Sequence, residues 1–335
     1  MKAWVVDGAF GVENLRCVER DVSSPGRGQV RVRVEACSLN FRDHLMVTGA
    51  YNPKQPLPLV PLSDGAGTVV EVGAEVRDLA AGDRVAGTFF RDWVAGPVPS
   101  RSVIRSTRGG PIDGMLAQEV VLEERELVKV PDHLTMVEAA TLPCAALTAW
   151  SALFGHGNLC AADTVLVQGT GGVAIFALQF AKMAGARVIA TSSSDERLER
   201  AKALGADETL NYRTDPDWGK TVQAAGGVTH VLELGGSATL PQSLRAVRPG
   251  GTLFLIGNLS GAEVEFNVLQ AVMQNVRLQG ILVGSRAEFV RMNRAIEHRR
   301  LHPVIDGVES FDRAPEAFRG FARGGHFGKV CIQVS

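Results

Sequence analysis

Residues 164–194 constrain the fold of this chain more than any other stretch, because they combine a strand, a glycine turn, a helix and a second strand. Residues 164–167 are apolar or β-branched and predict a buried strand. The turn that follows fits the pattern G-x-G-x-x-G/A with Gly169, Thr170, Gly171, Gly172, Val173 and Ala174. An apolar stripe at helical spacing then predicts a helix that Gly185 ends, before a second strand at residues 187–191.

This succession is typical of proteins that bind dinucleotides. The glycines let the backbone approach a pyrophosphate, and the N-terminus of the helix presents unpaired N–H groups to its negative charge. A glycine-rich turn that only packs a helix against a strand is the alternative. Because the motif lies inside a βαβ pattern, the sequence favours a nucleotide site.

The length of the chain, its charge and its cysteine content limit the classes of protein to which it can belong. At 335 residues the chain is long enough for two domains, each with its own core. It carries 35 basic and 36 acidic residues and no basic tract, which disfavours nucleic acid as a partner. Its five cysteines form no C-x-x-C pair, so we expect neither a disulfide framework nor a cysteine zinc knuckle, and a cytoplasmic location.

Two uncharged stretches, residues 139–162 and 164–181, are long enough to span a membrane. Both are interrupted by glycine or proline, which favours buried segments of a soluble protein. Met1 and Lys2 lead directly into a strand-like sequence, so no signal peptide is expected.

The pattern of predicted elements changes along the chain. Residues 1–125 contain short strands punctuated by glycine and proline, which predicts a partly open barrel. From Thr135, which begins a capping-box pattern with Glu138, strands and helices alternate and imply a parallel sheet with helices on both faces. A last helix at residues 287–300 and a terminal strand at 328–332 are expected to return to the first domain.

Six further segments make essentially the whole chain resemble the medium-chain dehydrogenase/reductase superfamily. They are residues 39–43, 64–69, 82–85, 139–142, 147–150 and 326–330. The resemblance implies an α/β protein with a GroES-like, partly open β-barrel catalytic domain and a Rossmann domain with a doubly wound parallel sheet. The expected boundaries are residues 1–135, completed by 287–335, for the catalytic domain and residues 136–286 for the Rossmann domain. The active site would lie in the cleft between the domains.

The superfamily contains zinc alcohol dehydrogenases and zinc-free reductases. A catalytic zinc needs three protein ligands, usually cysteine or histidine. Where the zinc branch has its first cysteine this chain has Asn40, and where it has histidine this chain has Ser63, so only Cys144 matches. Four closely spaced cysteines, as a structural zinc requires, are also missing between residues 90 and 115. We therefore predict no metal.

The resemblance also bears on the cofactor. An NAD site places an acidic residue at the end of the second strand, whereas a 2′-phosphate needs hydroxyls and cations. In the zinc-free branch the phosphate lies among residues that match Ser193, Arg197 and Tyr212, which favours NADPH. In the alternative, Ser193 forms a capping box with Glu196, and Arg197 lies on a solvated helix face.

The resemblance implies further contacts to the nicotinamide half of the cofactor. They involve Thr148, Gly257, Asn258, Ser285 and Arg286. Arg286 could instead cap the following helix or contact the substrate. Lys329 could reach the cofactor, but a surface position is favoured, and Asp64 is expected to pair with an arginine.

Two residues are candidates for catalysis. Hydride addition to an activated C=C bond leaves negative charge on the adjoining oxygen, and without zinc this charge needs hydrogen-bond donors and a proton source. Asn40, Asp43, Gly49 and Tyr51 reproduce the pattern N-x-x-D-x-x-x-x-x-G-x-Y of the enoyl-thioester reductases. The resemblance makes Tyr51 a proton donor or a residue that only packs on substrate, and it makes Asn40 a partner of the nicotinamide ribose or the substrate carbonyl.

The expected function is an NADPH-dependent oxidoreductase that transfers hydride to a quinone or to the C=C bond of an α,β-unsaturated carbonyl compound, without zinc. A zinc-dependent alcohol dehydrogenase and a non-catalytic NADPH-binding protein are the alternatives. The loop at residues 88–116, which would help to shape the cleft, matches no pattern that identifies a substrate. Residues 277–283 form a mostly apolar strand that predicts a homodimer by edge pairing.

Overall fold

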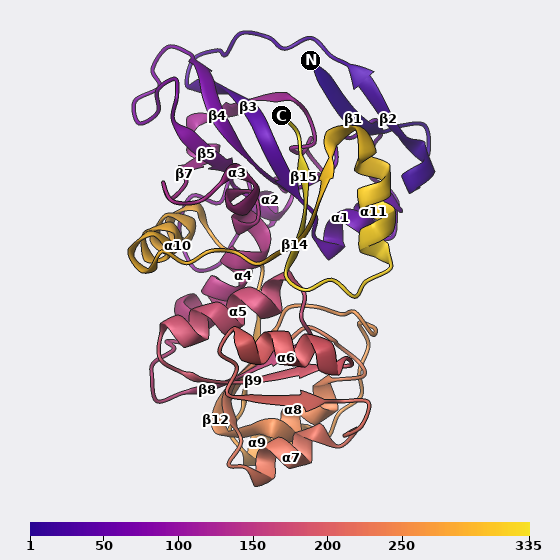
Figure 1. The fold of residues 1–335 in the computed structure, drawn as a ribbon, viewed down its shortest axis with the longest axis vertical. Helices are drawn as coiled ribbons and strands as arrows, with labels where there is room; N and C mark the ends of the chain where they lie inside the picture. Colours follow the sequence, from indigo (N-terminus) through magenta and orange to yellow (C-terminus); the bar gives the residue numbers. More distant parts are fainter. The chain divides into compact units, whose positions relative to one another are not determined.

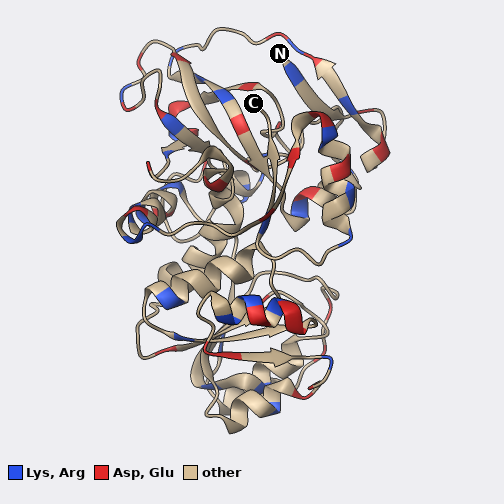
Figure 2. Ribbon diagram, viewed as in Figure 1, with Lys and Arg blue, Asp and Glu red and all other residues tan.

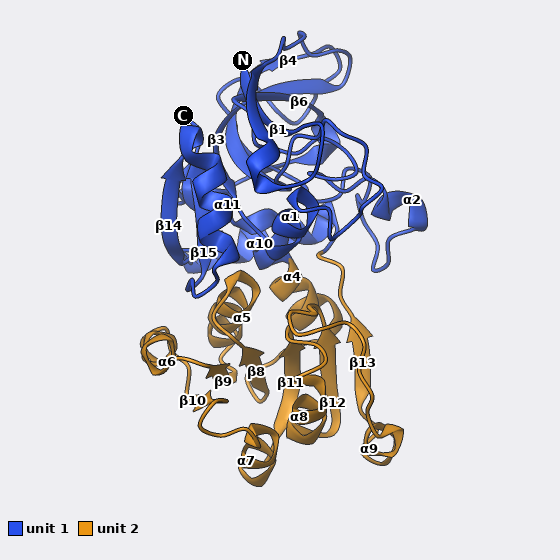
Figure 3. Ribbon diagram, turned by 90° about the vertical axis from the view of Figure 1, so that its right-hand side faces the viewer, with its two compact units in different colours: residues 1–147, 284–335 blue, residues 148–283 orange.

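The computed structural model describes residues 1–335, and the chain forms two compact units (Figure 3). Unit 1 comprises residues 1–147 and 284–335, and unit 2 comprises residues 148–283. The sequence had placed residues 136–147 in the second domain. They belong to unit 1 because α3 (Met136–Ala139) packs against the strands β3 and β4 of that unit.

Unit 1 is built on a seven-stranded sheet with the order β14-β15-β3-β4-β5-β7, in which β6 also pairs with β3. Its strands are β3 (Gln29–Ser38), β4 (Asp64–Val72), β5 (Arg84–Gly87), β6 (Glu119–Glu123), β7 (Leu127–Lys129), β14 (Ile305–Ser310) and β15 (Lys329–Gln333). Only the β14–β15 pair is parallel. The C-terminal strand β15 thus returns to β3, as the sequence predicted, and the partly open GroES-like barrel is confirmed (Figure 1).

The other elements of unit 1 are short, apart from α10 and α11. They are β1 (Lys2–Val6), η1 (Val12–Asn14), β2 (Leu15–Glu19), α1 (Phe41–Val47), α2 (Arg101–Ile104), η2 (Glu124–Glu126), η3 (Leu142–Ala146), α10 (Arg286–Arg299), η5 (Phe311–Arg313) and α11 (Ala314–Ala322). A short helix, α4 (Leu147–Trp150), joins the two units in sequence.

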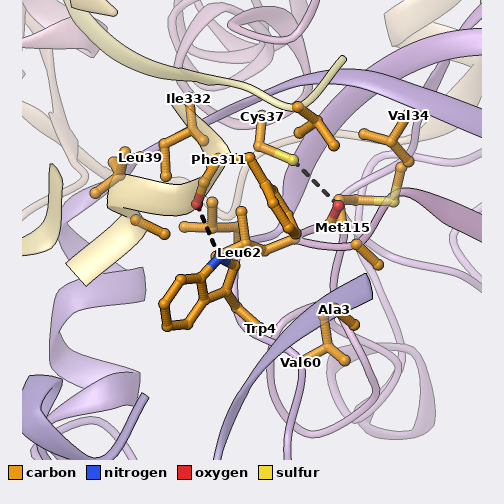
Figure 4. Close-up of a cluster of buried hydrophobic side chains, with 14 of the residues drawn as sticks. Ala3, Trp4, Val34, Cys37, Leu39, Val60, Leu62, Met115, Phe311 and Ile332 are labelled. Atoms are coloured by element: carbon orange, nitrogen blue, oxygen red, sulfur yellow. Dashed lines mark hydrogen bonds between the residues drawn. The ribbon is translucent and has the colours of Figure 1, made fainter. Parts of the chain in front are cut away.

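The core of unit 1 joins segments from the two ends of the chain (Figure 4). Trp4 is buried and donates its indole N–H to the carbonyl oxygen of Phe311 at 2.8 Å. Cys37, also buried, contacts the carbonyl oxygen of Met115 through its sulfur at 3.1 Å. These polar contacts satisfy the few hydrogen-bonding groups within an otherwise apolar cluster, so residues near position 311 are needed to complete a core that begins at residue 3.

Unit 2 contains a six-stranded, wholly parallel sheet with the order β10-β9-β8-β11-β12-β13. Its elements are η4 (Ser151–His156), β8 (Thr164–Gln168), α5 (Gly172–Met183), β9 (Arg187–Ser192), α6 (Asp195–Ala203), β10 (Glu208–Asn211), α7 (Trp218–Ala224), β11 (Val228–Glu233), α8 (Leu240–Ala246), β12 (Val247–Leu255), α9 (Val268–Met273) and β13 (Arg277–Gly280). The chain adds strands outward from β8 to β10, then returns to β11 and adds strands in the other direction. This reversal confirms the doubly wound sheet of a Rossmann domain.

The helices of unit 2 differ in how much charge they carry (Figure 2). Helix α5 has one charged residue, Lys182, and buries Phe176 and Phe180 against the unit. Helix α6 carries acidic and basic residues along its length and buries only Leu198 and Ala201. The uncharged stretch from residue 164 to 181 is therefore a buried strand, a turn and a covered helix. No helix in the structure is both long enough and apolar enough to cross a membrane.

Candidate functional site

The glycine turn of unit 2 joins β8 to α5. Gly169 has a φ of +74°, in the left-handed region that favours glycine, and its N–H donates to the carbonyl oxygen of Thr191 at 2.8 Å. Gly171 is the N-cap of α5, and the first i→i−4 bond of this helix runs from Ile175 to Gly171. The N–H groups of Gly172, Val173 and Ala174 therefore have no acceptor within the helix. Together with the buried Thr170 they lie in the turn that the sequence predicts to bind an anion.

This turn lies at the point where the strand order reverses. Strands β8 and β11 are neighbours, but their connections leave in opposite directions, because β8 leads to β9 and β11 leads to β12. In open parallel sheets, ligands bind outside the carboxyl ends of the strands at such a reversal. Gln168 and Glu233 are the last residues of these two strands.

The residues expected around a 2′-phosphate gather at the neighbouring strand ends of β9 and β10. Ser192 pairs with Asn211, and the N–H of Tyr212 donates to the carbonyl oxygen of Ser192 at 3.1 Å. The guanidinium of Arg197 donates to the hydroxyl oxygen of Ser193 at 3.0 Å. The ring of Tyr212 is 42% exposed. The structure thus brings the three predicted residues to one sheet edge.

The capping pattern proposed as the alternative for Ser193 is wrong. The N-cap of α6 is Ser194, whose hydroxyl accepts from the N–H of Arg197 at 3.4 Å, so the predicted box of Ser193 with Glu196 does not form. Asp195, the nearest acidic residue that could accept ribose hydroxyls, already accepts from the side-chain amide of Asn211 at 2.7 Å. The Ser193 hydroxyl is therefore not used in capping the helix.

A buried carboxylate at the end of β11 was missed by the sequence analysis. Glu233 is 1% exposed, and its oxygens accept from neutral N–H and O–H groups rather than from a cation. One oxygen accepts from the N–H groups of Gly235 and Gly236, at 3.0 and 2.9 Å, and from the hydroxyl of Thr239. The other accepts from Gln168 at 2.8 Å and from the hydroxyl of Ser243.

Through these bonds Glu233 orders the loop that follows it. Gln168 also accepts from the N–H of Leu234 at 3.0 Å, so the ends of β8 and β11 hold the loop from both strands. A glutamate between two leucines, in the sequence H-V-L-E-L-G-G, does not reveal the partners of such a network. An acidic residue at the end of an otherwise apolar strand is the only sequence cue that could have identified it.

The predicted residues Gly257 and Asn258 lie in a second loop, which is fastened to the first. Ser260 donates its N–H to the carbonyl oxygen of Gly235 at 2.7 Å, and Ser237 donates its N–H to that of Gly261 at 3.1 Å. A Cβ on Gly257 would lie 2.4 Å from the carbonyl oxygen of Leu234, so only glycine allows this approach. Backbone hydrogen bonds thus join the loop after β11 to the loop after β12.

In unit 1 the predicted residue Asn40 precedes α1. Its backbone N–H donates to the carboxylate of Asp43 at 2.9 Å, so Asp43 has a structural role at the start of α1. The side-chain amide nitrogen of Asn40 lies 3.5 Å from the hydroxyl of Ser63, to which it donates. Ser63 in turn donates to Asp64 at 2.7 Å. Asn40 is thus the first member of a buried polar chain.

Lys329 lies at the centre of this group, and its expected surface position is wrong. It is 2% exposed, and its ammonium donates to the side-chain oxygen of Asn40 at 2.6 Å and to the carbonyl oxygen of Leu39 at 2.7 Å. The burial arises because Lys329 begins β15, which enters the sheet beside β3. A lysine at the start of a terminal strand gives no sequence signal of its partner strand.

Asp64 also differs from expectation, because its cation is Lys329 rather than an arginine. The two charged groups are 3.9 Å apart, and Asp64 is fully buried. Burial raises the pKa of the Asp64 carboxyl above its usual value, although Lys329 and the hydrogen bonds from Asn40 and Ser63 oppose this shift. We call Asn40, Ser63, Asp64 and Lys329 the polar cluster.

Tyr51 is 55% exposed and its ring covers a fixed arginine. The guanidinium of Arg42 lies 5.3 Å from the centre of the Tyr51 ring and 5.6 Å from that of Phe89. Arg42 is held by Asp43 at 2.9 Å and by three carbonyl oxygens of residues 108–110. Tyr51 therefore has a rigid surface beneath its ring and an accessible side chain.

Three other predicted cofactor residues are placed as follows. Ser285 is the N-cap of α10, and its hydroxyl accepts from the N–H of Glu288 at 3.3 Å. Arg286 is the first residue of that helix and donates to the carbonyl oxygen of Leu127 at 3.2 Å. Both belong to unit 1, and the residue that caps the helix is Ser285 rather than Arg286. Thr148 is buried at the start of unit 2.

The donor set of the polar cluster does not fit a catalytic metal. No three side chains of histidine, cysteine, aspartate or glutamate come together in a way that could hold a metal ion. Near Asp64, the backbone N–H of Cys144 donates to the carboxylate at 3.3 Å, and the ammonium of Lys329 is already present. An ammonium and neutral side chains surround Asp64, whereas zinc requires thiolate, imidazole or carboxylate ligands in sufficient number.

Comparison with known proteins identifies relatives of the whole chain. A family model described as alcohol dehydrogenase GroES-like domain matches residues 26–132, and one described as zinc-binding dehydrogenase matches residues 172–298. A zinc-type alcohol dehydrogenase-like protein of Schizosaccharomyces pombe is 40% identical over 98% of both chains. A quinone oxidoreductase-like protein 2 homolog of Nematostella vectensis is 30% identical over 99% of this chain and 86% of its own.

A solved structure is similar over the same extent. The crystal structure of a putative alcohol dehydrogenase from Sinorhizobium meliloti 1021 superimposes with a TM-score of 0.93 at 42% identity, and the match covers 99% of this chain and 98% of that one. The names of these relatives include both alcohol dehydrogenases and quinone oxidoreductases. The relatives therefore share the architecture, and their names do not agree on a substrate.

The network around Glu233 predicts that Glu233→Gln weakens cofactor binding. The amide would present two N–H donors to groups that are themselves donors, and leaving buried groups unpaired costs about 1–3 kcal/mol. We expect a lower midpoint of urea unfolding and weaker quenching of protein fluorescence by NADPH. Ser243→Ala is the comparison variant, because it removes a hydroxyl that donates to Glu233 and accepts from Gln168 at 2.7 Å but leaves the carboxylate in place. Equal effects of both variants would contradict the role of the carboxylate.

Proposed function

This chain belongs to the medium-chain dehydrogenase/reductase superfamily, and from this premise we propose that it is an NADPH-dependent oxidoreductase that works without zinc. Its acceptor is a quinone or the C=C bond of an α,β-unsaturated carbonyl compound. The single observation that supports this proposal most strongly is the ammonium of Lys329 in the polar cluster, 2.6 Å from Asn40.

The polar cluster favours chemistry based on hydrogen bonds. An alcohol dehydrogenase of the zinc type needs a metal to stabilise an alkoxide, and the residues present here do not supply its ligands. The name of the S. pombe relative points to zinc, whereas that of the N. vectensis relative points to quinone reduction. The hydrogen-bond donors of the polar cluster support quinone reduction rather than zinc-dependent alcohol oxidation.

The residues of unit 2 bind the cofactor, and those of unit 1 act on the substrate. In unit 2 the N–H groups at the start of α5 bind the pyrophosphate, while Ser193, Arg197 and Tyr212 hold the 2′-phosphate. The bound cofactor supplies the hydride. In unit 1 Asn40 stabilises the oxygen on which charge develops, and Tyr51 donates a proton or hydrogen-bonds that oxygen.

NADPH oxidation by the purified protein, measured across quinones, enones, enoyl-thioesters and alcohols with NADP⁺, tests the proposal. We expect turnover with quinones or enones, no loss of activity in chelator, and no stoichiometric zinc by elemental analysis. One zinc per chain with alcohol oxidation would identify a zinc alcohol dehydrogenase. NADPH binding without turnover on any electrophile would instead favour a binding protein.

A second test concerns the 2′-phosphate. Charge-assisted hydrogen bonds contribute on the order of 1.5–3 kcal/mol, so Arg197→Ala should weaken NADPH binding roughly ten- to hundredfold and leave NADH binding nearly unchanged. Isothermal titration of both cofactors measures this difference. Lys202→Ala on the same helix is the control for net charge, since Lys202 pairs with Glu199 at 2.8 Å. Equal losses for NADPH and NADH would show that Arg197 serves the helix.

Tyr51→Phe tests the proton donor. General acids contribute about 10²–10⁴-fold, so kcat on an enone should fall by about that factor while the KM for NADPH stays constant. The fall should be smaller on quinones, because their reduced oxygens can take protons from water. Tyr212→Phe removes the hydroxyl of the other tyrosine in the chain, which is proposed to bind the 2′-phosphate, so it should change the KM for NADPH and leave kcat at saturating NADPH unchanged. Unchanged kcat for Tyr51→Phe on both classes would reduce Tyr51 to a packing residue.

We further propose that a second copy of the chain covers the free edge of unit 2. β13 is the last strand of its sheet, and an apolar group of exposed side chains lies on or near it. These are Leu259, Val268, Leu269, Val272, Met273, Leu278 and Leu282, with Met273 82% exposed. A mostly apolar, unpaired edge favours strand pairing between chains.

Light scattering at micromolar concentration should therefore give the mass of a dimer. Leu278→Lys places a charge on the edge strand and should shift the mass toward the monomer. Val98→Lys, at a residue of unit 1 that is 77% exposed, is the control and should leave the dimer intact. A monomer mass for the unmodified protein would exclude this assembly.

A further inference from the structure

We infer that Lys329 is a positioning residue that fixes the side-chain amide of Asn40 with its N–H group available to the substrate oxygen. This inference rests on the proposed function, because it assigns a hydrogen-bond donor to the oxyanion formed in that reaction. It goes beyond that function by naming which end of the Asn40 amide acts and what holds it there.

The orientation of the amide follows from the chemistry of its partner. A lysine ammonium has three donors and no acceptor, so only the carbonyl oxygen of Asn40 can face it. The distance of 2.6 Å between the Lys329 nitrogen and the Asn40 oxygen is that of a strong, charge-assisted bond. A rotation of the amide by 180° would place an NH₂ group against the ammonium and lose this bond.

The ammonium itself is fixed. Lys329 also donates to the backbone carbonyl oxygen of Leu39 at 2.7 Å, and its side chain is almost fully buried. Asp64 lies 3.9 Å away and balances the charge. Because Leu39 directly precedes Asn40, the same ammonium holds the backbone and the side chain of adjacent residues.

The amide nitrogen of Asn40 has spare donor capacity. It carries two N–H bonds. Within the protein it makes a long contact of 3.5 Å to the Ser63 hydroxyl, and its interaction with Asp64 lowers the pKa of that carboxyl. The Ser63 hydroxyl donates onward to Asp64 at 2.7 Å, so it can only accept from Asn40. The N–H groups of Asn40 are therefore not engaged in a short hydrogen bond within the protein, so a substrate oxygen can accept from one of them. Asn40 retains 8% of its surface exposed, whereas Ser63, Asp64 and Lys329 retain at most 2%.

This arrangement matches the needs of hydride addition to an enone. The hydride forms a bond to the β-carbon, the π electrons of the C=C bond move toward the carbonyl, and the oxygen becomes an enolate. NADPH is oxidised to NADP⁺, and a proton from Tyr51 or water later reaches the α-carbon. A preoriented donor is most effective at the oxygen where charge develops. The nearby ammonium polarises the amide and makes its N–H a stronger donor.

Asn40→Asp is the most discriminating variant. It preserves the size of the side chain and an oxygen acceptor for Lys329, but it removes the N–H donor. Loss of one oxyanion donor lowers kcat about 10²–10³-fold, and we expect a fall of that order with the KM for NADPH unchanged. An Asn40→Asp variant with full activity would overturn the inference. The role of Asn40 in catalysis would then require only its oxygen acceptor or its place before α1, and not its N–H donor.

Lys329→Met tests the positioning role. It should lower kcat by roughly 10- to 100-fold, as observed when partners that orient the groups of a site are removed. The variant Lys329→Met/Asn40→Asp should be no slower than Asn40→Asp alone, because residues that act through one group are not additive. Additive losses, or weaker NADPH binding by Lys329→Met, would show that Lys329 acts independently of Asn40.

Thermal melting separates these effects from a loss of fold. If the uncompensated Asp64 prevents Lys329→Met from folding, Lys329→Met/Asp64→Asn removes both charges and should show the same fall in kcat. If the unmodified protein turns over and Lys329→Met/Asp64→Asn has the same kcat, the positioning role of Lys329 is overturned and the proposed function stands. Failure of the unmodified protein to reduce any electrophile overturns the proposed function and, with it, the oxyanion that the inference requires.

Discussion

The buried ammonium of Lys329 is the constraint on which unit 1 depends most. A charge removed from water must be surrounded by acceptors, and here they come from three distant parts of the chain. Leu39 and Asn40 lie between β3 and α1, Asp64 begins β4, and Lys329 begins β15. The ammonium therefore requires the C-terminal strand to lie beside β3 and the turn after β3 to hold one conformation. The same requirement orients the candidate catalytic residue.

Local signals in the sequence were sufficient to predict the architecture. The glycine turn at residues 169–172, the alternation of strands and helices and the capping box of Thr135 with Glu138 all appear as predicted. These features depend on neighbours within a few residues, which periodicity and capping patterns describe well. Strand β13 is shorter than predicted and ends at Gly280, because the backbone leaves the extended region by Val283, where φ is +43°.

The charged interior could not be predicted in the same way. Lys329 was expected at the surface, Asp64 was expected to meet an arginine, and Glu233 was not noticed. Each of these outcomes depends on a partner brought close by strand order: Lys329 lies 289 residues from Asn40, and Gln168 lies 65 residues from Glu233. A pattern within one segment carries no information on such pairs. The predicted cap at Ser193 failed by one residue, because Ser194 and Ser193 are chemically equivalent and only the backbone decides between them.

The two buried carboxylates are stabilised by different means, and the difference suits their surroundings. Asp64 has an ammonium nearby, which opposes the rise of its pKa caused by burial. Glu233 is satisfied by neutral N–H and O–H groups alone. The neutral donors of Glu233 come from β8, from α8 and from the loop after β11, so the carboxylate joins these three segments. The charged partner of Asp64 instead comes from β15, the last strand of the chain, and it joins that strand to β4. The fold thus compensates one buried carboxylate with a cation and the other with neutral hydrogen-bond donors.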